Sequence, residues 1–199
     1  MSITSVPLNT PISFMGEGIR PIPMETQILH LDHGYDWIWE NQFDGLNRNR
    51  IRKAKKEGLT VTEDVSDAAI VYDNLYKANL EKRKGPKGLV YPKELFHQLA
   101  QCKRNVKFYF SLLNDQPIAG IIILYGNKEV SYWSGVTLSE YKKLNATQLL
   151  LDYAIQKAIE GNVSIFDFGA SMGLPNVKKF KSLFGPEDVG YTIYEWKRF

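Results

Sequence analysis

Between residues 106 and 137, apolar positions alternate with polar ones or run together in stretches rich in β-branched and aromatic residues, which favours strands. Asn114-Asp115 and Gly126-Asn127 interrupt these stretches, and such pairs are typical of tight turns between antiparallel strands. The pattern therefore predicts an antiparallel meander, with strands near residues 106–113, 118–125 and 128–137.

The rest of the chain shows mainly the spacing of amphipathic helices, separated by short strand-like runs. Helices are expected at residues 35–43, 49–58, 66–82, 145–160 and 176–184 and after Pro92. Strands are expected at residues 24–32, 59–64, 163–169 and 191–199. Asn145 stands where it can cap the long helix, with Gln148 at the capping-box position. This order of elements predicts an α/β (α+β) fold with a mixed, mainly antiparallel sheet flanked by helices.

The first 23 residues differ from the rest of the chain, because they hold four prolines and two glycines and no sustained period. We interpret residues 1–23 as an extended N-terminal arm and residues 24–199 as a single domain. The chain contains no apolar stretch near the ~20 residues needed to cross a bilayer, and its start lacks the layout of a signal peptide. A cytoplasmic location is the resulting expectation.

Charge and cysteine content narrow the function classes. The net charge of +3 is unevenly spread, with basic blocks at residues 48–56, 82–87 and 178–181, so an anionic ligand is expected. Cys102 is the only cysteine, which excludes an internal disulfide and a multi-cysteine metal site. Asp167-Phe168-Gly169 matches the magnesium-binding tripeptide of protein kinases, but the sequence lacks the other parts of a kinase, and we exclude that class.

An ordered set of segments carries a family resemblance. The segments are RNRIRKAKKEGLTV, FYFSLLNDQPIAGIIIL, VSYWSGV, EYKKLNATQLLLDYAIQKAIEG, FDFGAS and FKSLFG. Together they resemble the FemAB-like branch of the Gcn5-related N-acetyltransferase superfamily, over about residues 20 to 199. Members of that branch include aminoacyl-tRNA-dependent peptidyl transferases that build peptidoglycan cross-bridges.

The resemblance implies an acyltransferase or aminoacyltransferase that moves an acyl group to an amine, in cell-envelope or peptidoglycan precursor synthesis. It implies acyl-CoA or aminoacyl-tRNA as the donor substrate and no permanently bound cofactor or metal. The implied partners are an anionic small-molecule or lipid-linked precursor and tRNA. FemAB-like proteins usually carry two such domains, so a single domain exposing the missing contact surface is expected to form a homo-oligomer.

Three residues are candidates for catalysis. Lys181 matches the FK…FG stretch that lies near the transferring centre in the FemAB-like pattern, which implies that its ammonium stabilises developing negative charge. The open alternative is a solvated helix lysine. Asp167 either orients an amine or caps the loop that follows it, and Tyr132 either lines a pocket or packs the sheet.

Binding candidates fall into two groups, each with a structural alternative. Arginine and lysine side chains after residue 47 either grip a diphosphate or form the solvated face of a helix. The substrate-binding candidates are Arg48, Arg50, Arg52, Lys53, Trp133, Gly169, Ser171 and Phe180. The donor-binding candidates are Lys142, Lys143 and Asn145.

The segment that holds the donor-binding candidates has no glycine between Gly135 and Gly161. Most Gcn5-related acetyltransferases carry spaced glycines there, in the loop that grips the CoA pyrophosphate. A non-catalytic binding or assembly domain that keeps the fold therefore remains an alternative. A nucleic-acid-binding module is a further one, because the same basic surface would suit it.

Overall fold

An eight-stranded sheet organises the chain in the computed structural model, which describes residues 2–4, 19–63, 65–82 and 90–196. Its strand order is β1-β8-β2-β7-β6-β5-β4-β3. The strands are β1 (Ser2–Thr4), β2 (Ile19–His30), β3 (Thr60–Thr62), β4 (Val106–Leu113), β5 (Gln116–Tyr125), β6 (Glu129–Thr137), β7 (Ile165–Asp167) and β8 (Glu187–Trp196). Neighbouring strands are antiparallel, except that β6 and β7 are parallel. The predicted meander is confirmed as β4, β5 and β6.

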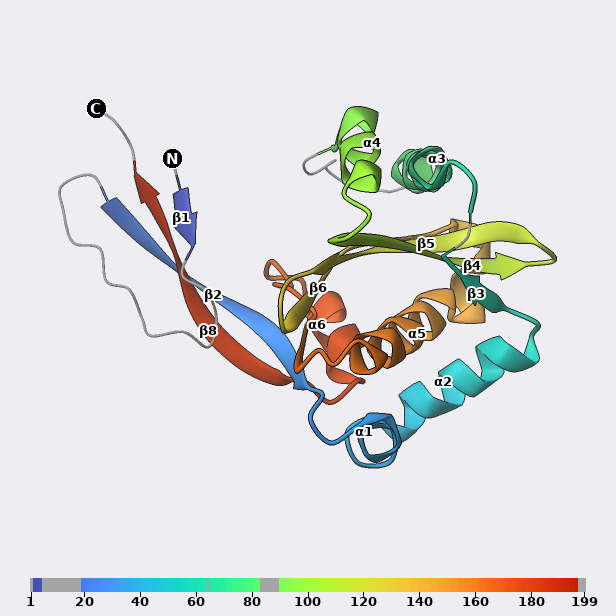
Figure 1. Cartoon of the computed structure of the whole chain (residues 1–199), viewed down its shortest axis with the longest axis horizontal. Coiled ribbons are helices and arrows are strands. Elements are labelled where there is room, and N and C mark those ends of the chain that lie inside the picture. The colour runs from blue at the N-terminus through green and yellow to red at the C-terminus, as the bar shows by residue number, and fades with distance from the viewer. Residues whose placement is uncertain (1, 5–18, 64, 83–89, 197–199) are drawn as a thin grey trace.

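Helices cover both faces of this sheet. They are α1 (Tyr35–Asn41), α2 (Gly45–Lys56), α3 (Ala68–Lys82), α4 (Lys93–Gln101), the 3-10 helix η1 (Ser139–Leu144), α5 (Ala146–Glu160) and α6 (Pro175–Ser182). In Figure 1, α3 and α4 lie over one face, while α5 lies against the other with α2 outside it. The predicted fold class, a mixed and mainly antiparallel sheet flanked by helices, is confirmed.

Two apolar cores result from this layering. The larger lies between the sheet and α5, where Leu150, Leu151 and Ile155 are completely buried. The smaller lies under α3 and α4 and contains Tyr72 and Phe96, whose ring centroids are 5.1 Å apart. Strand β5 contributes to both, because consecutive side chains of a strand point to opposite faces. The meander is thereby fixed between two helical layers.

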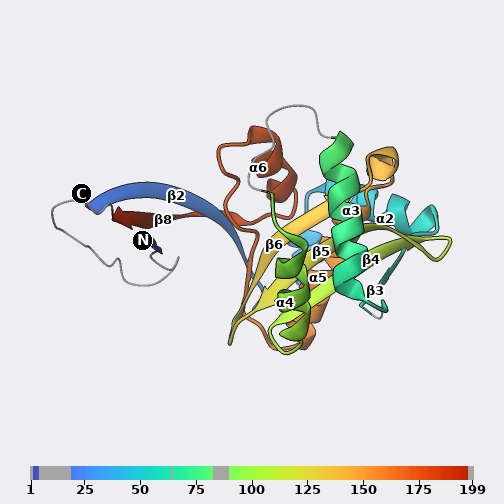
Figure 2. The ribbon, with the colours of Figure 1, turned by 90° about the horizontal axis from the view of Figure 1, so that it is seen from above.

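Strands β2 and β8 form a long ribbon that projects from the body, with β1 at its edge (Figures 1 and 2). Strand β2 pairs with β8 from Ile19 to Ile28 but with β7 only from Ile28 to His30. The boundary predicted at Met24 therefore falls inside β2. Pro21 and Pro23 are compatible with the strand because a proline, which has no N–H, is tolerated where one strand edge has no partner. Residues 5–18 of the predicted arm lie outside the described residues.

The turn after α6 packs closely against the end of α1. Gly185 has a φ of 74°, and a Cβ atom at this position would lie 2.2 Å from the carbonyl oxygen of Gln42. The Asp44 N–H also donates to the Leu183 carbonyl oxygen at 2.9 Å. Only glycine fits this contact, which sets the position of α6 relative to the α1–α2 corner.

Replacing Gly185 with alanine is predicted to destabilise the fold by about 3 kcal/mol or more, because the positive φ and the clash with Gln42 add. Gly58→Ala is the matched control, since Gly58 has a φ of 82° but a Cβ atom there would have no other atom within 4 Å. It should lose only about 1–2 kcal/mol, the cost of the backbone conformation. Urea unfolding measures both values, and equal losses would contradict the packing role of Gly185.

Candidate functional site

Strands β6 and β7 separate soon after they meet. Their parallel register runs from Glu129↔Ile165 to Ser131↔Asp167 and stops where β7 ends. Strand β6 continues to Thr137, paired with β5 on its other side. The chain after β7 turns away at Gly169, whose φ is 73°. An opening therefore lies beside the second half of β6, along an edge that β7 does not pair.

A bulge in β6 coincides with this opening. Tyr132 pairs with Ile123 and Ser134 pairs with Ile122, so Trp133 is the additional residue on β6. The Trp133 ring packs against Tyr91 with centroids 5.0 Å apart, on the side of the α3 and α4 core. Trp133 therefore packs the sheet, which is the structural alternative for this substrate-binding candidate.

A cavity of about 320 Å³ occupies the region where the strands separate. Its lining comes from the end of β6, the start of α5, η1, α3 and α6. The lining residues are Asn79, Gly135, Val136, Thr137, Lys142, Ala146, Thr147, Gln148 and Phe180. We call it the β6–α5 cavity. Of the sequence candidates, the structure brings Phe180 and Lys142 to this cavity.

The start of α5 forms one wall of the β6–α5 cavity. Asn145 adopts the left-handed conformation with a φ of 59°, and its side chain does not cap the helix. Its Nδ2 donates instead to the Lys143 carbonyl oxygen at 3.3 Å, so the predicted capping box is wrong. The left-handed backbone directs the amide back along η1. Since no side chain from Asn145 occupies the first turn, the positive end of α5 is available to an anionic group.

Tyr132 places its hydroxyl next to this cavity. A Cβ atom at Gly135 would lie 2.1 Å from the Tyr132 hydroxyl oxygen, so the hydroxyl rests over a residue of the cavity lining. Burial raises the pKa of Tyr132 to about 12, and the hydroxyl remains protonated at neutral pH. A protonated hydroxyl in this position can donate a proton to a group in the cavity. The contact with Gly135 could not be read from the sequence, because it depends on the bulge.

Lys181 holds the loop that follows β7. Its side chain is buried at 4% exposure, and its Nζ donates to the carbonyl oxygens of Gly169 at 2.7 Å and Ala170 at 3.1 Å. Burial lowers the pKa of Lys181 to about 8. Lys181 is therefore not a solvated helix lysine, and it does not line the β6–α5 cavity. The structure gives it a positioning role on the loop.

Asp167 holds the same loop from its other side. Its Oδ1 accepts a hydrogen bond from the Gly169 N–H at 2.7 Å and another from the Thr26 hydroxyl. This is the loop-capping alternative for Asp167. Gly169, with its positive φ, belongs to the same arrangement, and Ser171 lies two residues further on, in the lining of a different cavity.

The basic residues of α2 lie away from the β6–α5 cavity. The Arg48 Nη1 donates to the carbonyl oxygens of Trp39, Glu40 and Phe43 at 2.7 to 3.1 Å, so it closes the end of α1. The Arg52 guanidinium lies over the Trp39 ring, 5.3 Å from its centroid. Arg48 and Arg52 therefore stabilise the α1–α2 corner, and none of the predicted diphosphate-binding residues Arg48, Arg50, Arg52 and Lys53 lines the β6–α5 cavity. Residues 83–87 of a second basic block lie outside the described residues.

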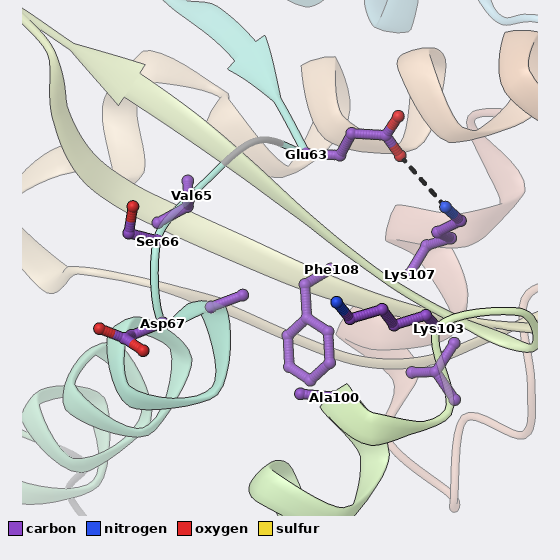
Figure 3. A pocket seen from close by; sticks show the side chains of 10 residues that line it. Glu63, Val65, Ser66, Asp67, Ala100, Lys103, Lys107 and Phe108 are labelled. Atoms are coloured by element: carbon purple, nitrogen blue, oxygen red, sulfur yellow. Dashed lines mark ion pairs between the residues drawn. The ribbon is translucent and has the colours of Figure 1, made fainter.

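Another cavity, of about 710 Å³, lies at the start of α3. It is separate from the β6–α5 cavity, whose lining residue Asn79 lies near the other end of the same helix. Figure 3 shows the Phe108 ring on its wall and the ion pair between Glu63 and Lys107 at 3.7 Å. Both charged side chains are about 40% exposed. In the described part of the chain, no buried polar atom that lacks a partner lines this cavity.

The structure also bears on metal binding and on membrane insertion. Within the described ranges, no three His, Cys, Asp or Glu residues come together in a group that could hold a metal ion. Across the same ranges, no helix has both the length and the apolar character required to span a membrane.

Comparison with known proteins gives the family and the fold. The sequence model of the family described as "Acetyltransferase (GNAT) domain" matches residues 47–187. The structure is similar to FemX, with a TM-score of 0.72 and 14% identity, over 84% of this chain and 61% of FemX. It is similar to L-PGS from Bacillus licheniformis, with a TM-score of 0.64 and 17% identity, over 91% of this chain and 63% of that one.

A smaller protein has a related fold. The ribosomal-protein-S18-alanine N-acetyltransferase from Escherichia coli matches with a TM-score of 0.52 and 8% identity, over 71% of this chain and 96% of its own. No curated protein sequence matches the chain significantly. At these identities the structural likenesses show the fold, and the chain spans less than two thirds of the length of FemX and L-PGS.

The lowered pKa of Lys181 predicts a pH dependence of stability. Between pH about 8 and 10.5 the unfolded chain binds the Lys181 proton and the folded chain does not, so raising the pH through this window favours the folded state. The free energy of unfolding of the wild type should therefore rise relative to that of Lys181→Met across this window. Urea unfolding at several pH values measures the difference, with Lys179→Met, at an exposed position of the same helix, as the control. A difference that does not change with pH would contradict the burial of a titrating ammonium.

Proposed function

The chain belongs to the acetyltransferase (GNAT) domain family, and on that basis we propose that it transfers an acyl or aminoacyl group from an activated donor to an amine. The observation that carries the proposal is the β6–α5 cavity. It combines an unpaired strand edge, a helix start without a side-chain cap and a protonated tyrosine hydroxyl. These are the features that binding and cleaving an activated acyl donor requires.

The donor is proposed to bind with its phosphate groups at the start of α5. Backbone N–H groups of the first helical turn and the positive helix end favour negative charge there, and the exposed Lys142 adds a cation at the cavity lining. The acyl portion would extend along β6 toward Tyr132. Acyl-CoA and aminoacyl-tRNA share this chemistry, since both present phosphates and an activated carbonyl.

The transfer itself needs no metal ion and no covalent enzyme intermediate. The amine nitrogen attacks the donor carbonyl carbon, forming the N–C bond and a tetrahedral oxyanion. Backbone N–H groups of β6 near the bulge at Trp133 are proposed to stabilise that oxyanion. The C–S bond of a thioester, or the C–O bond of an aminoacyl ester, then breaks. Tyr132 gives its proton to the leaving sulfur or oxygen, and the proton lost by the amine restores the hydroxyl.

The acceptor is proposed to be an amine on a cell-envelope or peptidoglycan precursor. The support is the resemblance to the FemAB-like branch and the similarity of the fold to FemX. An anionic or lipid-linked precursor would agree with the basic character of the chain, whose net charge is +3. Because the chain covers 61% of FemX, the acceptor and any tRNA contact are proposed for this chain by analogy of fold.

A binding or assembly domain is the second candidate function. It is favoured by one observation: η1 and Asn145 occupy the segment before α5, and no glycine lies between Gly135 and Gly161. This segment lacks the glycine-spaced backbone that grips the donor pyrophosphate in most Gcn5-related enzymes. A domain of this kind would bind a donor-like ligand or a partner without turnover.

Tyr132→Phe tests acyl transfer directly. The change removes the proposed proton donor and keeps the ring that rests over Gly135, so turnover should fall by about a hundredfold or more while donor affinity stays nearly constant. Single-turnover rates with acetyl-CoA and with aminoacyl-tRNA, each with a primary amine acceptor, provide the measurement.

Tyr125→Phe is the control for that measurement, because the Tyr125 hydroxyl bonds to the Tyr109 hydroxyl at 2.9 Å and neither residue lines the cavity. An unchanged rate in Tyr132→Phe would refute the role of this hydroxyl. Donor binding without turnover by the wild-type protein, with either donor, would favour the binding domain instead.

A further inference from the structure

A second cavity, of about 740 Å³, lies between β2 and the loop that leads into α6. Most of its walls are apolar, and two of the apolar side chains, Met172 and Leu174, are 72% and 50% exposed. The lining residues are Pro23, Met24, Glu25, Gln27, Ser171, Met172, Gly173, Leu174, Pro175 and Lys178. We call it the β2–α6 cavity. Nothing in the proposed handling of the donor uses it.

Two polar atoms in the lining of this cavity lack partners. Gln27 is only 3% exposed, yet its Oε1 has no hydrogen-bond partner among the described residues. The buried Ser171 Oγ is also without one in the same part of the chain. A buried polar atom without a partner carries a free-energy cost, so native proteins rarely leave one unpaired. A ligand that donates a hydrogen bond to Gln27 would remove this cost.

The backbone around both polar groups is held in place. The Gln27 carbonyl oxygen accepts a hydrogen bond from the Phe168 N–H at 2.8 Å. Thr26 bonds to Asp167, and because side chains alternate along a strand, Gln27 points to the opposite face of β2. The loop before Ser171 is fixed by Lys181 through the carbonyl oxygens of Gly169 and Ala170. The backbone that carries the two polar groups is therefore fixed before a ligand binds.

The charges at the edge of the β2–α6 cavity argue against an anionic ligand. Lys178 forms ion pairs with Glu25 and, at 2.9 Å, with Asp188. Its ammonium is thus shared by two carboxylates, and these three side chains carry one net negative charge. Phosphate groups belong at the other cavity, where α5 begins. The features that remain here are apolar walls, an acceptor oxygen and a hydroxyl, which match an amide group attached to an apolar chain.

The two cavities lie on opposite flanks of α6. Pro175 and Lys178 line the β2–α6 cavity, whereas Phe180 lines the β6–α5 cavity. At about 100° per residue, Phe180 projects from roughly the opposite side of the helix to the other two. Two ligands can therefore occupy the cavities at once.

We propose that the β2–α6 cavity is a second binding site, in which Gln27 and Ser171 hold the amide group of a ligand whose apolar portion lies against Met172 and Leu174. As a site separate from the donor cavity, it takes a part of the acceptor remote from the reacting amine, which attacks the donor in the β6–α5 cavity. That last assignment rests on the proposed acyl transfer, whereas the binding site itself does not.

The experiment compares two probes of the same shape, N-methylisovaleramide and methyl isovalerate, of which only the amide has an N–H. Each is titrated into the isotopically labelled protein without any donor, and binding is followed by NMR shift changes. The wild type should prefer the amide by about tenfold, and Gln27→Leu should lose this preference while it still binds the ester. Ser171→Ala should weaken binding of the amide more than it weakens binding of the ester.

Stability gives an independent readout. Gln27→Leu removes an unpartnered buried polar atom and keeps a side chain of similar size, so its melting temperature should equal or exceed that of the wild type. Asn47→Leu is the matched control, because Asn47 is a buried amide whose Nδ2 and Oδ1 also lack partners among the described residues, but it does not line the cavity. It should leave the amide preference unchanged.

The proposed site would be overturned by equal binding of the two probes to the wild type, by a preference that survives in Gln27→Leu, or by a lowered melting temperature of that variant. In an active preparation, Gln27→Leu should raise the Michaelis constant for the acceptor and not for the donor. A protein that shows the amide preference but transfers no acyl group would refute the acceptor assignment together with the proposed function, and the binding site would stand.

Discussion

The parallel contact between β6 and β7 is short, and the place where it ends determines what the rest of the structure can form. Because β7 stops at Asp167 while β6 runs on to Thr137, one edge of β6 has no strand partner among the described residues beyond Ser131. The chain then turns at Gly169 and enters α6, which brings Phe180 to one side of the opening. The start of α5 closes the other side. The early end of β7 thus leaves space for the cavity and allows the chain to turn into α6, which borders that cavity.

The loop after β7 lines the β2–α6 cavity and leads into α6, which contributes lining residues to both cavities. Asp167 fixes its first residues and Lys181 its next carbonyl groups, so a carboxylate-capped turn and a buried ammonium stabilise one short segment. A lysine used in this way is costly to bury, which is consistent with the lowering of its pKa to about 8. These charges hold the loop in position, with the β6–α5 cavity on one flank of α6 and the β2–α6 cavity on the other.

Periodicity identified the parts of the fold that depend on local sequence. The meander and the long helix α5 follow from β-branched runs and helical spacing, and both were predictable within a few residues. Strand β2 begins before Met24, at Ile19, because Pro21 and Pro23 fit a strand that pairs on only one side there among the described residues. The Asn145 cap failed because a left-handed backbone conformation is not encoded in the capping pattern.

Less of the candidate site than of the fold could be predicted from the sequence. Phe180, Lys142 and Tyr132 were found through residue type and family resemblance. Contacts between distant segments decided the other cases. Arg48 turns back to carbonyl groups of α1, and the Gln27 Oε1 is buried without a partner among the described residues, in a cavity that β2 forms with the loop before α6. Neither arrangement leaves a signal in local spacing.

Hydrogen exchange measured with and without the donor tests most directly whether the opening between β6 and β7 is the donor site. Bound acetyl-CoA or aminoacyl-tRNA should slow exchange at the backbone amides of residues 135–137 and 146–148, which line the β6–α5 cavity. Protection confined to the cavity near Glu63 and Lys107, or no protection at donor concentrations that support binding, would contradict this account.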